Sequence, residues 1–175
     1  GTEPQQFVGG SGFIVPNLRI WNAKGVTKAS GSPSMTVTRS LDLSDGLLTF
    51  DGGTLVLDNG ATLIRRRTTA TLNNPLSYRG AINVSYIIDS DNGNLKTSFE
   101  LPAEAGSLNN LRINNLSSSQ ESSSVLLDRN INIGGTLFLD AGQFELGSSA
   151  AMLAPGGAID VTSGRIKSSG VGSLN

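Results

Sequence analysis

The feature that most constrains the fold is a succession of very short apolar and polar alternations. One series reads SLDLSDG, LLTFDGG, TLVLDNG and ATLIRRR, and a later series reads NINIGG, TLFLDAG, QFELGSS and AAMLAPGG. Alternation with a period of two is typical of β-strands, and Gly, Asn, Asp and Ser after each run are turn signals. Helical periodicity is almost missing. The pattern therefore predicts an all-β protein made of many short strands.

The chain also repeats itself, because PNLRIWN near the start returns as NNLRINN. The distance from Leu18 to Leu111 is 93 residues (111 − 18), and superposing the two strand series places Leu48 on Leu137, 89 residues apart (137 − 48). The repetition is architectural. We expect each copy to begin with NLRI, to continue through a Ser-rich connector and to enter a Gly-punctuated series of strands.

Repeated short strands suit a solenoid in which successive coils stack strand upon strand. Gly accepts positive φ and Asn tolerates it, so both are expected at the corners. A β-sandwich is the main competitor, but its strands are usually longer and richer in aromatic residues than the 5% found here. The sequence favours a right-handed parallel β-solenoid. It would be one body over residues 1–175, built from two related repeats at about 13–100 and 101–175.

The period-two pattern also predicts which side chains point inward in stacked rows. These are Leu41, Leu43, Leu48, Phe50, Leu55, Leu57, Ile131, Ile133, Leu137, Leu139, Phe144 and Leu146.

Composition excludes several functions. The chain has no Cys and no His, which removes thiol nucleophiles, thiolate or imidazole metal sites and His-based triads. The absence of Cys also fits an exported protein. Thirteen basic and fourteen acidic residues give a net charge of −1, so we expect no nucleic-acid partner. The Arg run at 65–67 alternates between faces of a strand and cannot form one patch unaided, so we expect a solvated edge there. No apolar run has the length of a membrane span.

Several motifs together point to a family. ELP is followed by NNLRINN and NINIGGTLFLDAGQFELG, and the first repeat supplies GATLIRR and GAINVSY. This combination resembles the repeat modules of large secreted or surface proteins of Bacteroidetes and related bacteria, often exported by the type IX system. The resemblance implies an extracellular or cell-surface structural module with no catalytic residues to carry over. Departures from the usual module are Trp21, Arg19, Arg112, Arg129 and Glu145, which replace Asn, Thr or other small residues.

The stretch DSDNGNLKTSFE imitates a calcium-binding loop. Asp89, Asp91 and Glu100 have the spacing of oxygen ligands. However, Gly93 and Asn94 stand in reversed order, and no helices flank the stretch. We therefore favour a polar turn over a calcium site, expect no cofactor, and predict that folding does not require calcium.

Carboxylates and exposed aromatic rings are the remaining chemical candidates. Asp51 and Asp140 occupy matching places in the two strand series, where a turn favours an acceptor for its own backbone. The other carboxylates considered are Asp42, Asp45, Asp58, Asp128 and Glu145.

Trp21, Tyr78 and Tyr86 can stack on a sugar ring, because aromatic faces suit carbohydrate C–H groups. Trp21 follows an inward position and should point outward. We expect Trp21, more than either tyrosine, to contact a ligand or partner.

Three functions compete. The leading hypothesis is a non-enzymatic extracellular or cell-surface structural module, a stalk or a filament-forming repeat. Its partners would be further repeats of its parent, or copies of itself, stacked end to end, because an uncapped solenoid end exposes unpaired backbone groups. A carbohydrate-binding module would need aromatic residues clustered on one flank. A polysaccharide lyase or hydrolase would need carboxylates and Arg or Lys gathered in a groove, and the sequence shows no obvious cluster of that kind.

Overall fold

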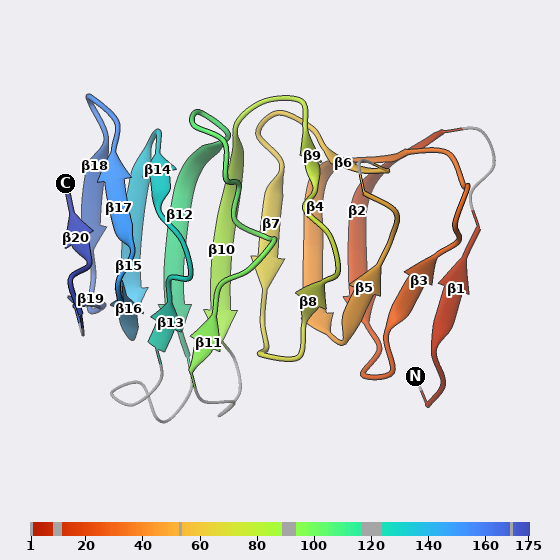
Figure 1. The fold of residues 1–175 in the computed structure, drawn as a ribbon, viewed down its shortest axis with the longest axis horizontal. Helices are drawn as coiled ribbons and strands as arrows, with labels where there is room; N and C mark the ends of the chain where they lie inside the picture. Colours follow the sequence, from red (N-terminus) through yellow and green to blue (C-terminus); the bar gives the residue numbers. More distant parts are fainter. Residues whose placement is uncertain (1, 9–11, 53, 89–93, 117–123, 169) are drawn as a thin grey trace.

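The computed structural model describes residues 2–8, 12–52, 54–88, 94–116, 124–168 and 170–175. Within these residues the chain forms strands and turns and no helix. Every described strand pairing is parallel, and the strands stack as a β-solenoid of about seven turns (Figure 1). The all-β parallel solenoid predicted from the short alternating runs is confirmed.

One long sheet runs the full length of the stack and contributes one strand to each coil (Figure 1). The strands that it contributes to successive coils are, in order, β2 (Phe13–Trp21), β4 (Met35–Asp45), β7 (Thr62–Arg65), β10 (Ile82–Ile88), β12 (Leu108–Asn115), β15 (Thr136–Ala141) and β18 (Ala158–Val161).

Shorter sheets close the coil on its other sides. A second side carries β1 (Gln5–Phe7), β3 (Val26–Lys28), β5 (Leu47–Thr49) and β8 (Thr71–Leu72), and then β11 (Leu95–Lys96), β13 (Ser124–Leu126), β16 (Gln143–Glu145) and β19 (Arg165–Lys167). A third side carries β6 (Leu55–Leu57) and β9 (Ser77–Tyr78), which join the long sheet because β6 pairs with the first residues of β4. Farther along the stack the third side carries β14 (Ile131–Ile133), β17 (Ala150–Leu153) and β20 (Ser173–Leu174).

The core consists of rows of side chains that run from coil to coil. Parallel register aligns one inward residue of each long-sheet strand with the next, in the row Leu18, Leu41, Leu63, Val84, Leu111, Leu137 and Ile159. Successive members lie between 21 residues apart (63 to 84) and 27 residues apart (84 to 111), which is the length of one coil. All twelve side chains predicted to point inward are buried, none more than 2% exposed. This prediction is confirmed.

The register corrects the alignment of the two repeats. Leu48 lies in β5 on the second side, whereas Leu137 lies in β15 of the long sheet, so these two residues are not equivalent. Leu18 pairs with Leu41 as Leu111 pairs with Leu137, which gives an offset of 96 (137 − 41) in place of 89. The error is seven residues, one strand with its turn. Neighbouring units look alike, and a slip by one unit keeps the apolar pattern intact.

Each repeat turns the same corner with a glycine and an asparagine. Gly46 and Gly142, 96 residues apart, have φ of 82° and 79°. A Cβ at Gly46 would lie 1.8 Å from the carbonyl oxygen of Asn22, and one at Gly142 would lie 2.4 Å from the Cβ of Asn115. Both asparagines are 1% exposed. No described non-glycine residue has positive φ, so the expectation of left-handed asparagines was wrong. Asn22 acts through its side chain, whose Oδ1 accepts from the backbone N–H of Lys24 at 3.1 Å.

Candidate functional site

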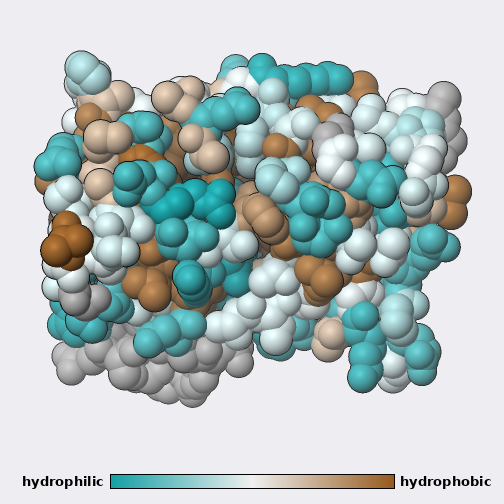
Figure 2. Space-filling model, viewed as in Figure 1, coloured by the Kyte–Doolittle hydropathy of each residue, from teal (hydrophilic) through white to brown (hydrophobic). Residues whose placement is uncertain are grey.

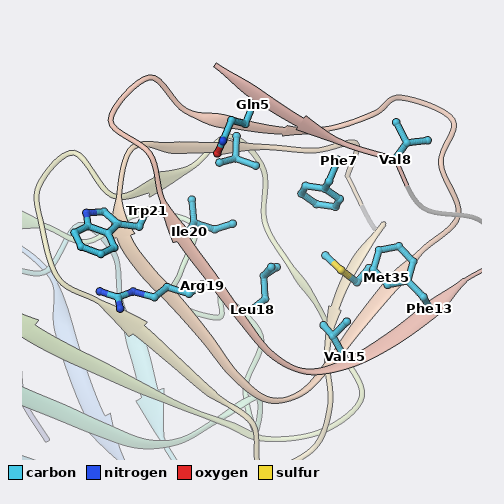
Figure 3. A pocket seen from close by; sticks show the side chains of 11 residues that line it. Gln5, Phe7, Val8, Phe13, Val15, Leu18, Arg19, Ile20, Trp21 and Met35 are labelled. Atoms are coloured by element: carbon cyan, nitrogen blue, oxygen red, sulfur yellow. The ribbon is translucent and has the colours of Figure 1, made fainter. Parts of the chain in front are cut away.

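Trp21 lies on the outer surface of β2, as the alternation predicts. The residue is 64% exposed. The guanidinium carbon of Arg19 lies 4.7 Å from the ring centroid, a cation–π contact on one face of the indole (Figure 3). The two side chains are two residues apart on one strand and therefore project from the same face of the sheet.

The next coil fixes the position of Arg19. The Nε of Arg19 donates to the Oγ of Ser44 at 2.8 Å, and this hydroxyl donates to the carboxylate of Asp42 at 2.9 Å. Arg19 also lies 4.0 Å from Asp42. Asp42 is aligned with Arg19 by the pairing of β2 with β4, so the contact follows from register.

The third coil contributes two more arginines. Arg66 Nε donates to both oxygens of Asp42 at 3.1 Å, and Arg67 donates to Asp45 at 3.4 Å. The hydroxyl of Thr69 donates to Asp45 at 2.6 Å. Asp42 and Asp45 therefore hold the arginine side chains of a neighbouring coil at defined places on the surface.

Together these side chains enclose a hollow of about 320 Å³, which we call the tryptophan hollow, lined by Arg19, Trp21, Ser44, Arg66 and Arg67. Sequence reasoning missed it. The expectation of a solvated edge is wrong for Arg65, which is the last residue of β7 and is 2% exposed. Stacking brings the next two arginines of the same run close to Arg19, 47 residues earlier (66 − 19). The expectation that no Arg and carboxylate cluster exists is therefore wrong for this face of the sheet.

A larger cavity of about 660 Å³ lies at the first coil, beside the tryptophan hollow (Figure 3). Its wall is mainly apolar, and Trp21 and Arg19 stand at its rim. The lining includes Phe7, Val8, Phe13, Val15, Leu18, Ile20, Val26 and Met35. Leu18 and Ile20 begin the inward rows of the long sheet, so this cavity is the uncovered end of the core.

A polar cluster interrupts the second inward row of the long sheet. That row reads Ile20, Leu43, Arg65, Tyr86, Ile113, Leu139 and Val161. Arg65 donates to Glu100 at 2.5 Å, and the side chains are 3% and 0% exposed. Glu100 Oε1 also accepts from the Tyr86 hydroxyl at 3.1 Å and from the backbone N–H of Ser98 at 3.0 Å. Glu100 Oε2 is buried and has no hydrogen-bond partner.

This cluster corrects two expectations. Tyr86 is fully buried and cannot stack on a sugar, and burial, together with the neighbouring Glu100, raises the pKa of its hydroxyl well above the ordinary value. Glu100 faces Arg65 inside the core, so it is not an open calcium ligand. The period-two pattern of β10 is the signal for this burial, because it places Tyr86 in an inward row between Arg65 and Ile113.

The other proposed ligand residues do not join the tryptophan hollow. Tyr78 lies in β9 on a different side of the coil, and partial burial with the charge of Glu100 raises its pKa. Asp89 and Asp91 lie outside the described residues. No group of three or more acidic side chains that could hold a metal ion occurs in the part of the chain that the structure describes.

Most of the carboxylates considered as acids or bases are ion-paired. Asp128 pairs with Arg129 at 3.1 Å, Asp140 with Arg112 at 2.7 Å, and Glu145 with Lys167 at 3.7 Å. Partial burial opposes ionisation of Asp128, but hydrogen bonds from Arg129 and Thr97 outweigh it and lower the pKa.

The turn carboxylates do not all bond their own turn. Asp58 accepts from the adjacent backbone N–H of Asn59 at 3.0 Å. Asp51 instead accepts from the N–H of Gly31 on the preceding coil at 3.2 Å. Among the described residues, the side chains of Asp51 and Asp140 bond to Gly31 and Arg112 of the preceding coil rather than to their own turns.

Comparison with protein-family models, with curated proteins and with solved structures found no significant match to this chain. Among the described residues no helix is long and apolar enough to cross a membrane.

Proposed function

We propose that the chain is a non-enzymatic structural module of an extracellular or cell-surface protein, a rigid segment whose coils are continued by further coils. The observation that carries this proposal is the inward row of the long sheet, which is aliphatic in every coil from Leu18 to Ile159. A row of this kind gives each coil the same interaction with its neighbours, so length can be extended by adding units.

The two ends support continuation. Among the described strands, β2 pairs with β4 on one side only, and β18 pairs with β15 on one side only, which leaves backbone N–H and C=O groups at both edges. Exposed apolar side chains also lie in the first and last coils. Figure 2 shows hydrophobic residues at both ends of the long axis, and large exposed ones in the first and last coils are Val8, Ile14, Ile159, Val161 and Val171.

The carboxylates support a non-enzymatic role. A hydrolase needs two carboxyl groups free to exchange protons across a sugar bond. Asp42, Asp45, Asp128, Asp140 and Glu145 are each held by an Arg or Lys side chain. The absence of Cys and the resemblance to secreted repeat modules support the extracellular location. The expected partners are other repeats of the parent or copies of the chain.

Light scattering and negative-stain imaging over a concentration series test this proposal. We expect elongated particles that associate end to end as concentration rises. The double variant Ile159→Lys/Val161→Lys places charge on the last coil and should suppress association. Met152→Lys, on the outer surface of β17, should leave association unchanged. A wild-type chain that stays monomeric at every concentration would contradict end-to-end association.

A further inference from the structure

Comparing the two repeats separates residues that the fold requires from residues that serve another role. At the start of each repeat the inward and corner residues match, because Leu18, Ile20 and Asn22 correspond to Leu111, Ile113 and Asn115. Arg19 also has a counterpart, Arg112, which stacks on the ring of Phe138 at 4.6 Å. Residues shared in this way are explained by the fold that the two repeats have in common.

The rest of the tryptophan hollow has no such counterpart. Asn114 occupies the place of Trp21, at the offset of 93. Thr162 and Ser163 occupy the places of Arg66 and Arg67, at the offset of 96. The backbone confirms the second correspondence, since the N–H of Arg66 donates to Leu43 and the N–H of Thr162 donates to Leu139 in the same way.

The same coil geometry is therefore built in the second repeat without Trp21 and without the two arginines. A tryptophan that is 64% exposed does not contribute its full hydrophobic burial to folding. Arginine side chains at the surface contribute little to stability through ion pairs. Requirements of the fold do not explain why these three side chains are gathered in one hollow.

Their chemistry matches one class of ligand. The face of an indole binds the C–H groups of a pyranose ring, and guanidinium groups bind carboxylate or sulfate through paired hydrogen bonds. Three guanidinium groups line the hollow, and they pair with only two carboxylates, those of Asp42 and Asp45, which leaves one positive charge in excess. The side chains of Arg19 and Arg67 remain 55% and 39% exposed, so they retain N–H groups for a ligand.

We propose that the tryptophan hollow is a binding site for an anionic saccharide, a uronate or sulfated sugar. The sugar ring stacks on the indole of Trp21, and its acidic group is bound by Arg19 and Arg67. Arg66 is a positioning residue, because its hydrogen bonds to Asp42 hold the carboxylate that faces Arg19. A single-stranded nucleic acid is disfavoured, since the chain has a net charge of −1 and therefore no long-range attraction for a phosphate backbone.

Affinity electrophoresis of the whole chain tests the site, with polygalacturonate, dextran sulfate or neutral dextran in the gel. We expect retardation by one or both anionic polymers and none by dextran. Trp21→Asn installs the residue of the second repeat and should weaken retention about tenfold. The pair Arg66→Thr/Arg67→Ser installs the other second-repeat residues and should weaken it at least as much. Circular dichroism of each variant checks that the fold is kept.

Arg112→Ala is the matched control, since it removes the same guanidinium stack from the second repeat and should leave retention unchanged. Retention by uronate and by sulfate distinguishes which acidic group is preferred, and either result supports the proposal. It is overturned if neither anionic polymer retards the wild type, or if Trp21→Asn binds as well as wild type. Equal loss in Arg112→Ala, or tighter Trp21-dependent binding of an oligothymidylate, overturns it as well.

Discussion

Glu100→Gln probes the polar cluster that the solenoid buries in its aliphatic core. The change keeps the size of the side chain and removes its charge. Arg65 then remains buried, with a side chain 3% exposed, and faces a neutral amide. In addition, the new amide NH₂ group takes the place of Oε2, which has no hydrogen-bond partner in the native cluster. A buried guanidinium thus loses its counter-ion, and a buried donor is created without an acceptor.

The magnitude follows from these two effects. Removing one partner of a buried ion pair costs about 3 to 5 kcal/mol, because the remaining charge stays desolvated. The carbonyl oxygen of the new Gln can still accept from Arg65 and Ser98, which keeps the loss within this range. For a chain of this length each kcal/mol lowers the melting temperature by about 2 to 4 °C. We therefore expect a decrease of about 6 to 20 °C.

Thermal and urea unfolding followed by far-ultraviolet circular dichroism measure the effect. Tyr86→Phe is the matched control, since it removes one of the three donors to Glu100 Oε1 but leaves the ion pair intact. It should cost less, about 1.5 to 3 kcal/mol, the usual value of a hydrogen bond to a charged group. If Glu100→Gln costs under about 1 kcal/mol, or less than Tyr86→Phe, the cluster does not stabilise the core as described.

Leu63→Ala removes a fully buried member of the central row, and urea unfolding should show a loss of about 2 to 5 kcal/mol. Gly142→Ala should prevent folding or lower the melting temperature strongly, because φ is 79° and the new Cβ would overlap Asn115. Gly52→Ala is the control, since a Cβ there meets open space and φ is ordinary. Folding lowers the pKa of Asp128 from 3.8, so the stability that its carboxylate contributes is present above about pH 4 and is lost as pH falls through the pKa of the folded state. In thermal melts between pH 2 and 6, Asp128→Asn should lack this acid dependence. Millimolar calcium should leave the melting temperature unchanged, and a calcium-dependent rise would show a bound ion.

The sequence by itself determined which side chains enter the core and where the chain turns. Alternation along a strand is a local property, because successive side chains point to opposite faces whatever the strand pairs with. Leu41, Leu137 and the other members of the rows are buried for this reason, and the same rule sends Trp21 outward. The glycines at 46 and 142 were expected at corners because few other residues accept positive φ.

Only the tertiary structure decided which strand of one coil lies beside which strand of the next. The two polar clusters depend on this pairing. Lateral neighbours in this solenoid are 21 to 27 residues apart, and corner lengths, which vary from coil to coil, set that distance. The seven-residue strand units are alike, so the pattern cannot distinguish one register from the next. Arg65 thus meets Glu100 across 35 residues, and Arg66 comes close to Arg19 across 47 (66 − 19), through contacts that depend on register rather than on any local motif.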